Sequence, residues 1–225
     1  MDMELTKSEL QIMDVLWEAG KPLSRADLLQ QELNALDQRL CRFPAGFLQT
    51  LAGKFTDLNI CIVRSAQGSP ESGSLSTATG IQFFQDSGAY VVISTGKYAQ
   101  QALYHEFYHA MESHILTEST ALDQWDSLSP AGFTYGTGNQ DNDIYLRGQT
   151  RAFVDHYSMT YPKEDRARIF EYAMLPGMEN LFRSEYMQRK LNAVCTAVRD
   201  TYGLKRSPEI FLWEQYLVTP IVPSE

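Results

Sequence analysis

The chain has 225 residues, a formal net charge of −9 and an apolar fraction of 44%. This length is enough for one domain with a substantial core, and the composition is that of a soluble globular protein, not of a coiled coil, a collagen or a disordered chain. The negative charge, without a dense run of Lys and Arg, makes nucleic acid an unlikely main partner, because it would repel phosphates.

The N-terminus and the cysteines bear on the compartment. The first ten residues, MDMELTKSEL, contain no apolar signal-peptide core, and no later run reaches the roughly 18 apolar residues of a membrane span. We therefore expect a cytoplasmic protein with no membrane span, and secretion or surface attachment only if the start is misassigned. Cys41, Cys61 and Cys195 are odd in number and far apart, which predicts buried free thiols and neither a disulfide framework nor a zinc knuckle.

Two short helices are expected at the start of the chain. A capping-box pattern begins a helix over 5–18 that stops at Gly20, and a second such pattern begins at Ser24. The stretch LTKSELQIMDVLWEAGKPLS resembles the opening of the penicillinase-repressor type of winged-helix proteins. The resemblance ends near residue 30, where NALDQRLCRFPAGFLQ replaces the recognition helix and wing. We expect residues 1–30 to be a helix-turn-helix-like segment, an incomplete winged helix or a fusion remnant, without a DNA-reading helix.

The remaining residues, 31–225, are expected to form one α+β domain. The β-branched run LNICIVRS predicts a buried strand, and GIQFF with AYVVIST predicts a hairpin bent at Ser87-Gly88. The stretches 66–80 and 117–150 are rich in small and polar residues and predict mostly loop. Helices are expected over 99–116, from about Pro162 to Met174 and from about Ser184 to Tyr202.

The stretch YHEFYHAMESH holds three of the four histidines of the chain. On a helix, His105 and His109 project from one face, one turn apart, where both imidazoles can bind one tetrahedral ion. Glu106 can then reach a water on that ion without being a ligand, which is the general-base position of the His-Glu-x-x-His zinc proteases. The alternative is an amphipathic helix with surface histidines. His114 lies five residues after His109, on another face, and is expected beside the site or on the surface.

Two histidines alone would bind a metal weakly, so a third ligand is expected downstream. Pro162 suits the first turn of a helix, with Thr160 as a cap before it, and acids in that turn would be held on a rigid scaffold. The residues alone leave five candidates open: Glu164, Asp165, Glu171, Asp155 and His156.

The segment YSMTYPKE, from Tyr157 to Glu164, resembles the Tyr-x-x-Thr-Asn-x-x-Glu stretch that follows His-Glu-x-x-His in the lethal-factor type of zinc endopeptidase. The resemblance implies a gluzincin-like zincin fold, with Glu164 as the third zinc ligand and Tyr157 as a hydrogen-bond donor to the oxyanion. The sequence departs from the family at Tyr161, the Asn position, and at 166–168, where Arg-Ala-Arg stands instead of Phe-Phe-Ala-Glu. Residues 31–225 are also similar to a group of Firmicute zinc-peptidase-like proteins in which YHExxH and YSMTYPKEDRARIFEYAM occur together.

Motif and resemblance together predict a zinc metallopeptidase, a hydrolase acting on a peptide or protein substrate. Zn²⁺ on His105, His109 and Glu164 would activate a water. Glu106 would take its proton during attack on a carbonyl, and Tyr157 would help to hold the oxyanion. A non-peptide amide or cell-wall peptide is the second reading of the substrate. A regulatory or non-catalytic metal-binding protein with a winged-helix-like interaction segment is the alternative, but a structural site has no need for Glu106.

Four further positions have two readings each. The strand 89–95 is expected either at an edge, where it would pair with an extended substrate, or as an ordinary core strand. Asp155 is expected either to hydrogen-bond a ligand imidazole or to be a surface acid. Trp125 and Phe133 are expected either to line a substrate pocket or to cap the core.

Overall fold

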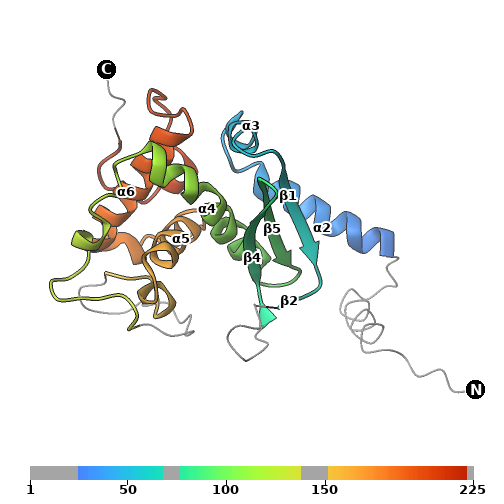
Figure 1. The fold of residues 1–225 in the computed structure, drawn as a ribbon, viewed down its shortest axis with the longest axis horizontal. Coiled ribbons are helices and arrows are strands. Elements are labelled where there is room, and N and C mark those ends of the chain that lie inside the picture. Colours follow the sequence, from blue (N-terminus) through green and yellow to red (C-terminus); the bar gives the residue numbers. More distant parts are fainter. Residues whose placement is uncertain (1–24, 68–76, 138–151, 222–225) are drawn as a thin grey trace, which may run out of the picture. The chain divides into compact units, whose positions relative to one another are not determined.

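The computed structural model describes residues 25–67, 77–137 and 152–221 (Figure 1). Within these ranges the chain forms five α-helices and a small three-stranded mixed sheet, which confirms the expected α+β class. None of the helices described there is long and apolar enough to cross a membrane. The chain divides into two compact units, Met1–Arg42 and Phe43–Glu225.

The described part of the first unit consists of the helix α2, Arg25–Leu40, and the turn at residues 41–42 that follows it. Asp27 in its first turn and Arg39 in its last complement the helix dipole. The helix predicted to begin at Ser24 is thereby confirmed, and the expected boundary near residue 30 falls inside it. The helix expected over 5–18 lies outside the described residues, so the role of residues 1–30 stays a prediction.

The second unit contains a sheet with the strand order β1-β5-β4. The strand β1 (Leu58–Val63) pairs in parallel with β5 (Gly88–Ser94), and β4 (Gly80–Gln85) pairs with β5 in the antiparallel sense. The prediction that β5 lies at the edge is therefore wrong, because β5 is the central strand. Its nearly continuous apolar sequence is typical of a strand with neighbours on both sides. The two edges of this described sheet are β1 and β4.

The hairpin of β4 and β5 is confirmed, but its bend lies one residue earlier than expected. Asp86 and Ser87 form the turn, with φ values of 49° and 64°, the left-handed geometry of a turn that matches strand twist. Gly88 pairs with Gln85 and is already part of the ladder. A Cβ at Gly88 would lie 3.2 Å from the Gln85 carbonyl oxygen, so the strand leaves little room there.

Short regular elements occur within the segments expected to be loops. The strands β2 (Ala66–Gln67) and β3 (Thr77–Ala78) form an antiparallel pair, and a 3-10 turn covers Trp125–Leu128. Residues 68–76 and 138–151 lie outside the described part of the chain. All three cysteines are free as expected, but only Cys195 is buried, since Cys61 is half-buried and Cys41 is exposed.

Three helices of the second unit agree closely with the sequence-based expectation. The helix α4 (Ala99–Glu118) packs against β4 and β5 and also against α5 (Pro162–Ala173) and α6 (Glu185–Thr201) (Figure 1). Ser184 caps α6 by accepting a hydrogen bond from the Met187 backbone N–H. As a result α4 is enclosed on most sides, and its apolar residues Ala102, Leu103, Phe107, Ala110 and Met111 are buried.

A cluster of aromatic side chains packs around Trp213 in the core of the second unit. Trp213 is fully buried in the 3-10 turn Leu212–Glu214. It packs against Phe47 at the start of α3 (Phe47–Ala52) with ring centroids 5.4 Å apart, and against Phe170 of α5 at 5.9 Å. Aromatic side chains bury large apolar areas, so this cluster ties α5 to the segments on either side of it in sequence.

Candidate metal centre

The helix α4 presents two histidines one turn apart, as the spacing predicts. The Nε2 atoms of His105 and His109 lie 3.1 Å from each other, with their rings nearly perpendicular at 83°. His105 is buried and His109 half-buried. Both rings therefore aim one nitrogen at the same point, and the reading as scattered surface histidines is wrong.

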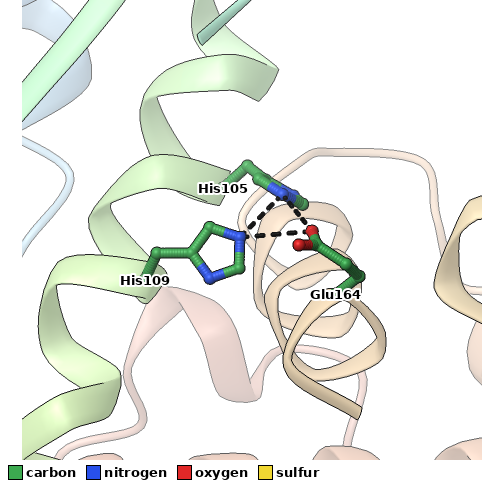
Figure 2. A group of neighbouring side chains, drawn as sticks. All are labelled: His105, His109 and Glu164. Atoms are coloured by element: carbon green, nitrogen blue, oxygen red, sulfur yellow. Dashed lines mark hydrogen bonds and ion pairs between the residues drawn. The ribbon is translucent and has the colours of Figure 1, made fainter. Parts of the chain in front are cut away.

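Glu164 comes to this point from the first turn of α5. Its Oε2 atom lies 3.1 Å from His105 Nε2 and 3.2 Å from His109 Nε2 (Figure 2). Pro162 begins the helix just before it, so the carboxylate is carried by rigid backbone. Among the described residues, Glu164 is the acid that completes a group with the two histidines.

The geometry of the three atoms fits a metal ion. Zinc bonds of about 2.0–2.1 Å at tetrahedral angles place neighbouring ligand atoms about 3.3 Å apart, close to the edges of 3.1 to 3.2 Å in this triangle. Hydrogen bonds alone satisfy the arrangement poorly, because one imidazole N–H can point at only one of two neighbours. His105, His109 and Glu164 could therefore hold a metal ion.

Glu171 has a role that the sequence did not reveal. It is buried on α5, and its Oε2 atom lies 3.1 Å from Nδ1 of His105, the ring nitrogen that faces away from Glu164. An Nδ1–H that donates to Glu171 leaves the lone pair of Nε2 free for a metal. Glu171 follows Glu164 by seven residues, two helical turns, and this spacing was the available signal that both acids share one face of α5.

Both expectations for Asp155, a surface position and a hydrogen bond to a ligand imidazole, are wrong. It is fully buried, so it is not a surface acid. One of its oxygens accepts a hydrogen bond of 2.8 Å from the backbone N–H of Ser158, and the other lies 3.2 Å from Nε of Arg168. The ligand imidazole is reached instead by Glu171, which accepts a hydrogen bond of 2.8 Å from the same arginine.

Glu106 and Tyr157, the two expected catalytic residues, flank the group. Glu106 is buried against Gly80 at the start of β4, so closely that a Cβ on Gly80 would lie 2.7 Å from Cγ of Glu106. Burial raises the pKa of Glu106, and the charges of the two histidines lower it only in part. The ring of Tyr157 lies 6.1 Å from that of His105. Burial, followed by the charge of Glu164 and a hydrogen bond with it, raises the pKa of Tyr157.

The carboxylates of the site favour a positive charge between them. Burial lowers the pKa of His105, but hydrogen bonds with Glu164 and Glu171 outweigh this effect and raise the pKa from 6.5 to about 10. Burial raises the pKa of Glu164, but hydrogen bonds with both histidines bring it well below its usual range. In the metal-free protein a proton on His105 therefore supplies the positive charge that the buried carboxylates require.

Buried ion pairs lock the helix that carries Glu164. The next residue, Asp165, lies 2.7 Å from Nζ of Lys190 on α6, and both side chains are fully buried. The residue after it, Arg166, lies 2.6 Å from Glu112 on α4. Leaving one partner of such a pair alone in the interior is costly. The two pairs therefore fix the position of α5 against both neighbouring helices.

Three residues singled out from the sequence lie away from the group. His114 is partly exposed, and its ring packs against Phe55 with centroids 4.9 Å apart. Trp125 is 3% exposed and donates a hydrogen bond to the hydroxyl of Tyr135. Phe133 packs on Phe153 with ring centroids 4.3 Å apart. Trp125 and Phe133 thus follow their reading as core-capping aromatics.

Removing a ligand should remove the metal. We expect about one ion per chain in the wild type, because three protein ligands and a water complete a tetrahedral site. We expect almost none in His105→Ala or Glu164→Ala. Elemental analysis of chain purified without chelator or affinity-tag nickel measures this, with His114→Ala and Glu106→Gln as controls that should keep the ion. Folded wild-type chain without metal would contradict the assignment.

Metal binding should depend on pH through His105. Because its pKa is raised, protonated His105 stabilises the metal-free fold fully below pH 6.5, and this stabilisation is lost as the pH rises through about 10. An ion must displace that proton, so the affinity for Zn²⁺ should rise about tenfold per pH unit between about pH 7 and 9. Calorimetry in buffers of different ionisation enthalpy should detect about one released proton per ion. An affinity that is constant over this range would refute the proton displacement.

Comparison with known proteins adds no family to this picture. No family model, curated protein or solved structure matches the chain. The site rests on its own geometry: three ligand atoms lie within 3.2 Å of one another, on two helices that the buried Arg166–Glu112 ion pair joins directly.

Proposed function

We propose that the protein is a zinc-dependent metallopeptidase with a zincin-like fold. The observation that supports this most is the convergence of His105, His109 and Glu164, with ligand atoms 3.1 to 3.2 Å apart. Glu106 is buried beside them and takes no part in the ligand group. Ligands and a neighbouring carboxylate in this pattern are what metal-assisted hydrolysis requires.

The donor set favours zinc in a catalytic setting. Two imidazole nitrogens and one carboxylate oxygen suit Zn²⁺. Three protein ligands leave the fourth position open, whereas structural zinc sites are closed by four. When bound, zinc supplies a water of lowered pKa and polarises the carbonyl that is attacked. The same three ligands would also accept other divalent ions, so zinc is proposed on its chemistry and its common use in such sites.

Glu106 is the proposed general base. Its carboxylate is held against Gly80 and is largely withdrawn from solvent. Burial raises its pKa, toward the value at which a base both accepts and returns a proton near neutral pH. Glu106 would accept the proton of the attacking water and then pass it to the leaving amine. A site that only stored or sensed metal would have no use for this carboxylate.

Tyr157 is the proposed helper at the oxyanion. Its ring lies beside that of His105, and its pKa is raised by burial and by Glu164. The hydroxyl therefore keeps its proton at neutral pH and remains a donor. A donor placed beside the developing negative charge lowers the barrier of acyl transfer.

The edge strand β4 is the proposed place for the substrate backbone. It begins at Gly80, which touches Glu106, and it has no partner strand on its outer side in the described chain. An extended peptide can add to such an edge by main-chain hydrogen bonds. We thus assign to β4 the pairing with an extended substrate that the sequence alone suggested for residues 89–95. Phe83 and Phe84 are 40% and 49% exposed on β4 and would contact substrate side chains.

Glu106→Gln should separate chemistry from metal binding. We expect the variant to keep its zinc and to lose hydrolysis by about 10²- to 10⁴-fold, because the amide cannot take a proton. Tyr157→Phe should lower kcat by about 10²-fold with little change in KM. The assay is cleavage of a peptide library by the zinc-loaded chain, read by mass spectrometry. Cleavage that survives both Glu106→Gln and removal of the metal would contradict the proposal.

Gly80→Ala should displace the general base. A methyl group there would overlap Cγ and Oε1 of Glu106, at 2.7 and 2.9 Å, so the carboxylate must move while the metal ligands need not. We expect zinc content to be unchanged and kcat to fall by about 10²-fold, the effect of a misplacement of about 1 Å. Gly88→Ala is the matched control in the same hairpin, since the three atoms nearest to a Cβ there belong to Gln85, Asp57 and Tyr90. Full turnover in Gly80→Ala would refute the role of Gly80.

A further inference from the structure

One arginine connects the two sides of the site. Arg168 lies one turn after Glu164 on α5, with its side chain 12% exposed. Its Nη1 atom lies 2.8 Å from Oε2 of Glu171, and its Nε atom lies 3.2 Å from Oδ2 of Asp155. The centre of its guanidinium group lies 5.1 Å from the centre of the Tyr157 ring. A single planar cation thus contacts two buried acids and one aromatic face.

We propose that Arg168 is a positioning residue that sets both the orientation of His105, through Glu171, and the place of Tyr157 beside it. The first half concerns metal binding alone. The second half rests on the proposed function, because it concerns the donor to the oxyanion.

The path to His105 runs through one oxygen atom. Oε2 of Glu171 is 3.1 Å from Nδ1 of His105 and 2.8 Å from Nη1 of Arg168. Glu171 is fully buried, and its cationic partners within the described ranges are Arg168 and His105, so loss of Arg168 would leave its charge with His105 alone in that part of the chain. The carboxylate could then turn away from Nδ1–H, and His105 would lose the bond that aims Nε2 at the metal.

The path to Tyr157 has two parts. The guanidinium lies against the ring itself, a contact for which an arginine is better suited than a lysine. Arg168 also pairs with Asp155, and Asp155 accepts the backbone N–H of Ser158, the residue after Tyr157. Ser158 returns a hydrogen bond of 2.7 Å from its hydroxyl to the Asp155 carbonyl oxygen. The turn that carries Tyr157 is therefore anchored to the same arginine.

The neighbouring Arg166 provides a matched comparison. It lies on the same helix with its side chain 10% exposed, pairs with Glu112 at 2.6 Å and packs over the ring of Trp125 at 5.5 Å. Arg166 thus has the burial, the ion pair and the aromatic contact of Arg168. Its partners, however, do not touch His105 or Tyr157 in the contacts described. A purely structural role would make the two arginines equivalent.

The test compares Arg168→Met and Arg168→Lys with Arg166→Met and Arg166→Lys. Zn²⁺ affinity is measured by competition with a chromogenic chelator, which needs no activity. We expect Arg168→Met to weaken binding about 10- to 100-fold, with Arg168→Lys in between. Arg166→Lys keeps the charge that pairs with Glu112 and should stay within about twofold of the wild type. Arg166→Met removes that pair and should weaken binding less than Arg168→Met does, because Arg166 does not contact Glu171. The lysine variants keep the charge and give the comparison if a methionine variant does not fold.

Turnover measurements test the second half of the proposal, the link between Arg168 and Tyr157. In the wild-type background, Arg168→Lys should change kcat more than it changes KM. In a Tyr157→Phe background the same substitution should lower kcat much less, because both changes act on the same hydrogen-bond donor. Losses that multiply independently would overturn the link to Tyr157. Equal Zn²⁺ affinities in the Arg168 and Arg166 variants would overturn the link to His105. A wild-type chain that binds Zn²⁺ tightly but cleaves no peptide would overturn the proposed function and the Tyr157 half, while the affinities still decide the first half.

Discussion

Charge is buried at the start of α5, and the pairing of that charge governs how the helices around it pack. Three consecutive charged residues, Glu164, Asp165 and Arg166, are buried there. An unpaired charge in the interior costs several kcal/mol, so each must meet a partner, and the partners lie on α4 and α6. With Asp165 on Lys190 and Arg166 on Glu112, the rotation of α5 is fixed. Glu164 then has one direction left, toward the two histidines.

This arrangement would make the proposed metal site ready before any ion arrives. The three ligand atoms already stand at nearly the separations that a tetrahedral ion imposes. A proton on His105 holds the place of the cation, because two buried carboxylates raise its pKa. Little rearrangement is then required on binding, and the main exchange is of a proton for a metal. The same packing brings Gly80 against Glu106, so the edge of the sheet and the proposed base are set together.

The sequence predicts those features that depend on residues close together in the chain. The helical period places His105 and His109 on one face whatever the rest of the chain does, and Pro162 marks the start of α5. The third ligand was one of five candidates until a resemblance singled out Glu164. The central place of β5 depends on parallel pairing with β1, more than 20 residues earlier, which no local pattern encodes. The role of Glu171 likewise depends on the rotation of α5 against α4, which is set by ion pairs distant in sequence.

A crystal structure of the zinc-loaded wild-type chain, with anomalous diffraction data at the zinc edge, would locate the ion. We expect one strong peak, about 2.0–2.1 Å from Nε2 of His105, Nε2 of His109 and an oxygen of Glu164, with one further position open to water. Glu106 should lie outside the ligand set. A folded chain that shows no peak at this point under saturating zinc, with the three side chains still in contact with each other, would contradict the metal site proposed for these residues.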